Sequence, residues 1–128
     1  MITRQPELAD EVRELLALDG DLLPVVLLNG PVVTSTGLFG VSQVTVDEAR
    51  HLVHLHGWVS AVGHEATAAV LSRILRVNVP MNRVEYQQQV GQLAIALTLN
   101  QRAPEGQVLS VEEMLKIGFS LLLLERLE

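Results

Sequence analysis

The chain has 128 residues, a mass of 14.0 kDa and 48% hydrophobic residues, which is typical of one globular domain with its own core. It contains no cysteine, which excludes disulfide frameworks, thiol nucleophiles and cysteine-ligated metal centres. Nine basic and fifteen acidic residues give a net charge of −6. This charge argues against a nucleic-acid coat or a polybasic membrane anchor, so we predict no DNA partner.

The acidic charge is concentrated at the N-terminus. Residues 1–21 hold six acids and two arginines, a net charge of 2 − 6 = −4. Pro6 suits a first helical turn, and an apolar stripe follows it at helical spacing, made of Leu8, Val12, Leu15 and Leu16. We therefore expect an appended acidic helix over 1–21 and the main domain over 22–128.

A stretch without charge between Asp21 and Asp47 does not predict a membrane span. It contains prolines, glycines and polar residues whose backbone groups a bilayer would leave unsatisfied. The N-terminus carries acids where a signal peptide needs an apolar run. We therefore predict a soluble, cytoplasmic protein with no membrane partner.

From residue 22, predicted strands and helices alternate along the chain. Short apolar or alternating runs predict strands at Val25–Leu28, within Val32–Phe39, and at Trp58–Val62, Arg83–Gln88, Gln92–Asn100 and Phe119–Leu124. Residues 83–88 and 92–100 are expected to pair as a hairpin through Val90 and Gly91.

Three helices are expected between these strands. Thr45 with Glu48, and Ser110 with Glu113, have the capping-box spacing that begins a helix. The first of these helices should end near His56, before Gly57, and another should run from about His64 to Arg76. Helices interleaved with strands predict the α/β class: a single-domain mixed β-sheet flanked by helices.

The turn Gly63-His64 is the most informative local feature. It lies where a predicted strand passes into a helix, so free backbone N–H groups and the positive end of the helix dipole favour an anion there. Gly63 would let a phosphate approach the backbone, and His64 would be placed to touch it. The alternative is that His64 is an ordinary capping or surface residue.

A second group of candidates lies at two predicted strand ends. Asn82-Arg83 begins one strand, and Arg102 with Glu105 follows another in a Pro-Glu-Gly turn. A guanidinium can neutralise a phosphate, and a carboxylate can orient either the guanidinium or a ribose hydroxyl. A surface ion pair beside a turn explains the same residues.

His51, His54 and His56 do not predict a metal site. Residues three apart share a helix face, but His56 lies off that face, and no neighbouring carboxylate or cysteine completes a ligand set. We predict exposed helix residues here, and no metal or cofactor.

Three blocks together resemble the viral and bacterial anti-CRISPR ring nucleases, which degrade cyclic tetra-adenylate, the second messenger of type III CRISPR immunity. The blocks are Ser60–Thr67 followed by Leu71-Ser72, Val79–Glu85, and Arg102–Gly106 leading to Leu109 and Glu112-Glu113. Weaker similarity runs from about Leu27 to the C-terminus.

The resemblance implies a homodimer that binds cyclic tetra-adenylate in a cleft at the dimer interface. It also implies a metal-independent phosphodiesterase in which a ribose 2′-hydroxyl attacks the adjacent phosphate, giving linear di-adenylates with 2′,3′-cyclic phosphate ends and switching off type III CRISPR effectors. A protein that sequesters the cyclic oligonucleotide without cleaving it is the alternative. A structural or DNA-associated role is disfavoured by the negative charge.

Carried over by position, the resemblance makes His64 the general acid, with Arg102 and Glu105 completing the catalytic group. The ligand-binding residues would be Asn29, Gly63, Thr67 and Arg83. The family can place a ligand-contacting serine after the loop asparagine, whereas Gly30 follows it here, so Thr34 or Ser35 would have to take that role.

Overall fold

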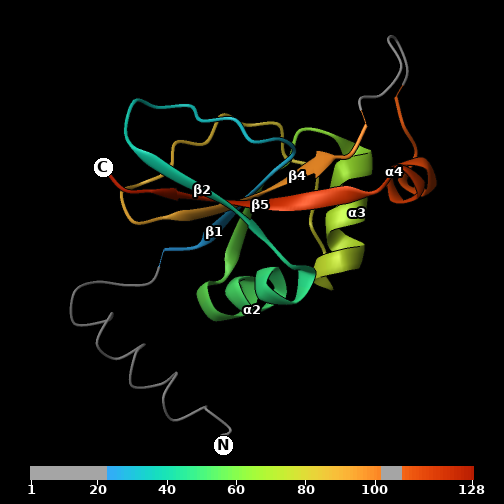
Figure 1. The fold of residues 1–128 in the computed structure, drawn as a ribbon, viewed down its shortest axis with the longest axis horizontal. Coiled ribbons are helices and arrows are strands. Elements are labelled where there is room, and N and C mark those ends of the chain that lie inside the picture. The colour runs from blue at the N-terminus through green and yellow to red at the C-terminus, as the bar shows by residue number, and fades with distance from the viewer. Residues whose placement is uncertain (1–22, 102–107) are drawn as a thin grey trace, which may run out of the picture.

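The computed structural model describes residues 23–101 and 108–128, and within them the chain forms a five-stranded mixed sheet with three helices (Figure 1). The strands are β1 Val25–Leu28, β2 Phe39–Val44, β3 Trp58–Ala61, β4 Leu93–Leu99 and β5 Phe119–Arg126. Their order across the sheet is β2-β5-β4-β1-β3. The predicted α/β class and single-domain mixed sheet are confirmed.

Parallel and antiparallel pairing divide the sheet into two halves. Strand β1 pairs in parallel with both β3 and β4, with Leu28 opposite Ala61 and Ala96. Strand β5 pairs antiparallel with β4 and with β2. The carboxyl ends of β1, β3 and β4 therefore lie at the same edge of the sheet.

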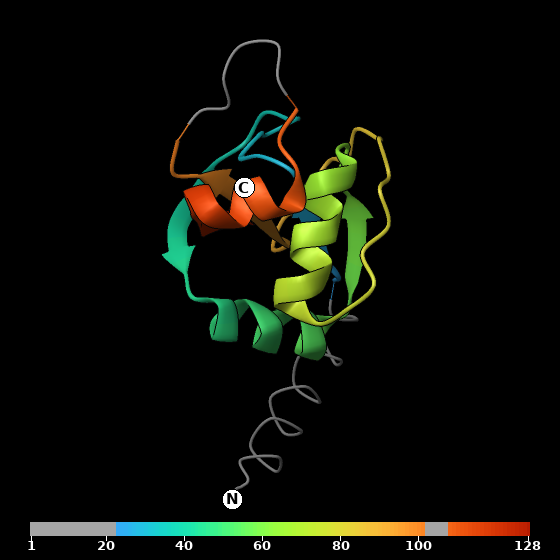
Figure 2. The same ribbon diagram turned by 90° about the vertical axis from the view of Figure 1, so that its right-hand side faces the viewer.

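The three helices of the described chain are α2 Val46–His56, α3 Glu65–Leu75 and α4 Val111–Ile117, and Figure 2 shows α3 beside α4 with α2 below them. All three pack on one face, because Val53, Leu71 and Met114 share a buried cluster with Leu27 and Ile95 of the sheet. The alternation in β4 explains this face: its large residues point toward the helices and its alanines point away.

The opposite face of the sheet has no helix among the described residues, and extended chain crosses it instead (Figure 1). Tyr86 packs against Val26 and Ala94, and the buried Gln88 side chain donates to the carbonyl of Leu124 at 3.1 Å. The Thr34 hydroxyl donates to the Tyr86 carbonyl at 2.6 Å, which joins the two crossing segments. These side-chain hydrogen bonds hold the crossing segments in place, as backbone hydrogen bonds would have held a further strand.

Two strand predictions were wrong. Within Val32–Phe39 only the last residue belongs to a strand, because β2 begins at Phe39. Residues 83–88 form no strand and no hairpin with β4, whose partners are β1 and β5. The apolar residues of both segments pack onto the open sheet face or remain exposed, so their alternation reflects the crossing of a face.

The other predicted elements are confirmed within one or two residues, including the helix starts at Thr45 and Ser110. The predicted appended helix over 1–21 lies outside the described residues. No helix of the described part of the chain is long and apolar enough to cross a membrane.

Candidate functional site

The candidate residues meet at the edge of the sheet where β1 and β3 end. After β1 the chain passes through Asn29 onto the open face, whereas after β3 it passes through Gly63 into α3 on the helical face. Neighbouring parallel strands whose following segments leave toward opposite faces open a crevice between them. Such crevices are the usual ligand sites of α/β sheets.

A hydrogen-bond network joins three of the predicted residues across this edge. The Gly63 N–H donates to Asn29 Oδ1 at 3.0 Å, and the Gly63 carbonyl accepts from Arg83 Nη2 and Nε at 3.1 and 3.3 Å. Both polar backbone groups of Gly63 are thus held by side chains from outside its own turn. The network fixes the peptide groups on either side of Gly63, immediately before His64.

Asn82, which was a candidate from the sequence, and Ser60, which was not singled out, hold the Arg83 segment in place. Asn82 donates through Nδ2 to the Ser60 carbonyl at 2.8 Å, and its N–H donates to the Val62 carbonyl at 2.7 Å. The Ser60 hydroxyl donates to the Pro80 carbonyl at 2.6 Å. Ser60 lies inside the block 60–67, which is the signal that could have identified it.

His64 occupies the N-cap position of α3, but its side chain makes no capping hydrogen bond. It is exposed, and its extended backbone points the chain into the helix. No described residue accepts from the N–H groups of Glu65, Ala66 or Thr67, the donors that open the helix. An exposed imidazole therefore stands beside three available backbone donors.

Two adjoining hollows lie in front of this helix start, with volumes of about 330 and 340 Å³. Asn29 and Thr67 line both of them, as do Leu99 and Met114. His64 lines the first, and the end of β4 with the loop after Asn29 lines the second. The site thus has an apolar floor and a polar rim at the carboxyl edge of the sheet.

The described residues that line the two hollows carry little net charge, and that charge is negative. Glu65 is the one carboxylate among the described lining residues, and the nearest arginine of the network is Arg83. Arg102 and Glu105 lie outside the described residues. Their segment is bounded by Gln101 and Val108, and each of these lines one of the hollows.

The structure describes two further positions named from the sequence. Thr34 uses its hydroxyl to bind Tyr86, and the buried Ser35 hydroxyl has no hydrogen-bond partner among the described atoms. Gly63 has no positive φ, and an added Cβ would meet Asn29 and Arg83 at ordinary contact distances of 3.5 Å or more. Its surroundings, more than an unusual backbone conformation, set the geometry of the turn.

The histidine run lies far from this edge. His51 and His54 are exposed on α2, and His56 ends that helix before Gly57. No group of three histidine, aspartate or glutamate side chains in the described ranges has a metal-binding arrangement.

Comparisons with known proteins find relatives over most of the chain. ORF117 of Acidianus two-tailed virus is 42% identical over 93 residues, which cover 70% of this chain and 80% of that protein. YddF of Bacillus subtilis is 32% identical over 108 residues, which cover 83% of this chain and all of that protein.

A solved structure shows the same fold. B116 of Sulfolobus turreted icosahedral virus (STIV) superimposes with a TM-score of 0.61 at 20% identity, covering 80% of this chain and 99% of that one. The sequence pattern of the STIV B116-like family matches residues 25–121, which include strands β1 to β4, the beginning of β5 and the residues that line the two hollows. The chain therefore belongs to the STIV B116-like family, which has both viral and bacterial members.

Proposed function

We propose that the protein is a homodimeric, metal-independent ring nuclease that cleaves cyclic tetra-adenylate. The observation that carries this proposal is the convergence of Asn29, Gly63 and Arg83 beside His64. These residues come from three separate parts of the chain, and two of the blocks that resemble ring nucleases supply Gly63, His64 and Arg83. The contact between the blocks is a prerequisite for one shared site.

The chemistry needs little from the protein, because the substrate brings its own nucleophile. A ribose 2′-hydroxyl attacks the adjacent phosphorus, a 2′,3′-cyclic phosphate forms, and the bond to the 5′-oxygen breaks. In the proposed reaction His64 gives a proton to that leaving oxygen, and the 2′-hydroxyl proton passes to solvent or a carboxylate. Positioning, charge stabilisation and one proton donor are then sufficient.

Each remaining residue has a role consistent with its chemistry. The N–H groups at the start of α3 and the Thr67 side chain lie where a phosphodiester would approach His64. Arg102 would neutralise the reacting phosphate, and Glu105 would orient that arginine or a ribose hydroxyl. Both follow Gln101, which already lines the hollow.

Exposed apolar side chains support the homodimer. Val32 and Val33 follow Asn29 with exposed fractions of 61% and 49%, and Met81 and Val84 flank Arg83 with 50% and 49%. Apolar side chains exposed beside a polar site are typical of a surface that another protein covers. A two-fold dimer would present two His64 residues to a ring of four phosphates, so that two cleavages give two di-adenylates.

The decisive experiment incubates the purified protein with cyclic tetra-adenylate and separates the products by chromatography. We expect linear di-adenylates with 2′,3′-cyclic phosphate ends. Recovery of the intact ring from a stable complex would instead support the sequestering function, and absence of binding would refute both.

The same reaction in excess EDTA tests the metal-independent mechanism. Because the proposed nucleophile is a ribose hydroxyl and the proposed acid is an imidazole, the cleavage rate should not change. Activity that disappears on chelation and returns with Mg²⁺ or Mn²⁺ would replace this mechanism with metal-assisted hydrolysis.

A further inference from the structure

A large hollow lies at the opposite end of the sheet from the candidate site. Its volume is about 680 Å³, and it is lined by α2, the start of β3 and the end of α3. Since β3 begins at Trp58 and reaches the candidate site only after Ala61, the two sites are separated by the length of the parallel strands. Neither the predicted chemistry nor the family resemblance uses this hollow.

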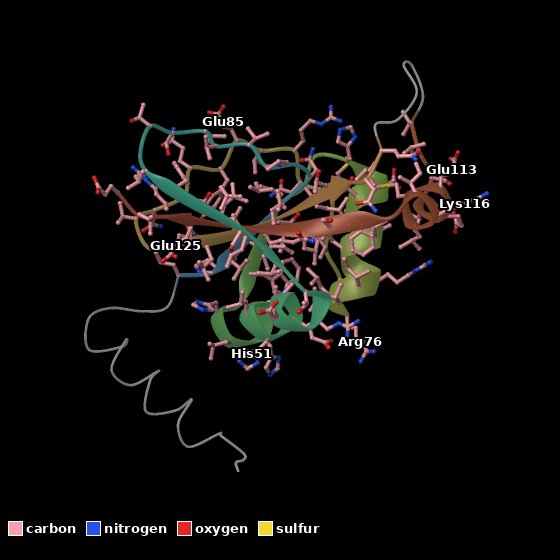
Figure 3. All side chains as sticks on the ribbon, viewed as in Figure 1. His51, Arg76, Glu85, Glu113, Lys116 and Glu125 are labelled. Carbon is pink, nitrogen blue, oxygen red and sulfur yellow. The ribbon has the colours of Figure 1, made fainter. Side chains whose placement is uncertain are left out.

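The rim of the hollow is basic. Arg50, His51, His54 and Arg76 line it, with Asp47 as the one carboxylate of the described lining. Asp47 pairs with Arg50 at 3.3 Å, whereas no described residue binds the side chain of His51, His54 or Arg76. Figure 3 shows His51 and Arg76 projecting at the α2 end of the molecule, away from the acidic Glu113 on α4.

The floor of the hollow is apolar. Val53 and Leu75 are buried at 3% exposure, and Trp58 and Val77 are partly buried around them. A basic rim over an apolar floor fits an amphipathic segment that carries acids beside an apolar stripe.

Residues 1–21 have this character, and they are attached beside the hollow. Val25 pairs with Trp58 in the sheet, and its N–H donates to the Gly57 carbonyl at 2.9 Å. Gly57 and Trp58 both line the hollow. The N-terminal segment therefore leaves the fold next to this basic hollow.

Charge and sequence both suit this occupant. The segment carries a net charge of −4, and Glu11 lies three residues from Leu8 and four from Leu15, beside the stripe of Leu8, Val12, Leu15 and Leu16. The family match begins at residue 25, so the segment is an addition to the shared fold. An addition with an apolar stripe needs a surface to cover it.

We propose that residues 1–21 dock in this hollow within the same protomer, with the apolar stripe on Val53, Trp58 and Leu75 and the acids against Arg76, His51 and His54. The docked segment covers this hollow and leaves the candidate site free. This proposal does not depend on the proposed function.

Trp58 is the only tryptophan and the chain has no cysteine, so a single spectroscopic pair can test the docking. A nitroxide label on Ala9→Cys quenches tryptophan emission on close approach. We expect the label to remove most Trp58 emission in the full chain. The matched control carries the label on Val108→Cys, an 87% exposed position at the candidate-site end, and should stay bright.

Charge reversal then tests the basic rim. Arg76→Asp should restore emission in the Ala9-labelled chain, since Asp tolerates the left-handed backbone at residue 76 (φ 59°) and reverses the charge. Arg73→Asp is the control, because Arg73 is an exposed arginine on the same helix that does not line this hollow. Sodium chloride at about 1 M, where the screening length falls to about 3 Å, should also restore part of the emission.

Three results would overturn the proposal. The first is a bright Ala9-labelled chain, or equal recovery with Arg73→Asp. The second is quenching when a labelled Trp58→Phe chain is mixed with an unlabelled chain, which would place a second copy in the hollow. The third is an Arg76-dependent response of Trp58 to inorganic triphosphate while the label has no effect, which would make the hollow a small-anion site.

Discussion

The three helices of the described chain begin in two different ways. At α2, the Thr45 hydroxyl accepts from the Glu48 N–H at 3.0 Å and the Glu48 carboxylate accepts from the Thr45 N–H at 2.8 Å. Ser110 and Glu113 repeat both bonds at α4. At α3, the N-cap His64 makes neither.

This difference separates stability from function within one structural layer. A closed capping box satisfies two orphan backbone groups and leaves little for a ligand to bind. An open start costs the helix some stability, but it keeps N–H donors and a positive dipole end available. The open start, that of α3, lines the candidate site. This is expected where a functional site is less stable than the scaffold that carries it.

Closing the open start should produce the largest effect. His64→Ser removes the proposed general acid, so single-turnover cleavage should fall by about 10² to 10⁴. Its N-cap hydroxyl also accepts from one of the free N–H groups, so ligand affinity should fall as well. The free energy of unfolding should rise by roughly 0.5 kcal/mol or more, because Ser is a better N-cap than His. Rapid-quench assays and urea titrations measure the two quantities.

His64→Ala is the control for that experiment, since it removes the imidazole without adding a cap. It should lose the same rate with no gain in stability. Cleavage near the wild-type rate in either variant, or a defect that is entirely loss of binding, would contradict the assignment of His64 as the acid.

Loosening the network behind His64 should have an intermediate effect. Arg83→Ala removes both donors to the Gly63 carbonyl, so ligand affinity and rate should each fall, by about tenfold or more for a charge-assisted interaction. Arg83→Lys keeps the charge but loses the two-donor geometry, and should recover only part of the loss. Calorimetry and single-turnover kinetics measure affinity and rate separately.

Arg73→Ala is the matched arginine control, because Arg73 is exposed on α3 outside the two hollows of the candidate site. An equal loss in this variant would mean that general positive charge, and not the position of Arg83, attracts the ligand. Arg102→Ala should weaken both binding and rate if Arg102 contacts the reacting phosphate.

Local patterns predicted most of the fold. The apolar run at residues 25–28 and the capping boxes at Thr45 and Ser110 depend on neighbouring residues alone, and the structure confirms them. The alternation at residues 83–88 failed as a strand signal, because Tyr86 and Gln88 face a sheet surface that they cross. Which surface a segment covers depends on strand order, and no short window of sequence contains that order.

The same distinction between local patterns and long-range contacts applies to the candidate site. His64 was located from the sequence because a glycine followed by a helix start is a local pattern. The bonds of Gly63 to Asn29 and Arg83 span 34 and 20 residues, so only the parallel pairing of β1 with β3 and the path after α3 bring these side chains together. The roles of Arg102 and Glu105 remain predictions.

Removing the capping boxes at the starts of α2 and α4 should have a moderate effect on stability. Thr45→Ala and Ser110→Ala each remove a hydroxyl that accepts from a backbone N–H, and each should lower the free energy of unfolding by about 1 kcal/mol. His64→Ala should cost less than either, since no side-chain capping bond is lost there. Equal losses in the three variants, measured by urea denaturation, would remove the contrast between the helix starts.

The smallest expected effect is a pH dependence of stability that arises from the two capping boxes. Hydrogen bonds from the Thr45 backbone and then from its side chain lower the pKa of Glu48, and Ser110 lowers the pKa of Glu113 in the same way. A carboxyl whose pKa is lower in the folded state contributes stability at neutral pH, and this contribution is lost as the pH falls through the lowered value.

Glu48→Gln tests this dependence because it can keep the bond to the Thr45 N–H while removing the charge. The wild type should be more stable than Glu48→Gln at pH 7, and the difference should shrink toward about pH 3, below the ordinary pKa of glutamate near 4.3. Glu112→Gln is the matched control, since Glu112 lies in the first turn of α4 but makes no capping-box bond. Its stability difference should vary less over the same range. If both variants followed the same pH profile in urea titrations, general charge at a helix start, and not the closed box, would explain the effect.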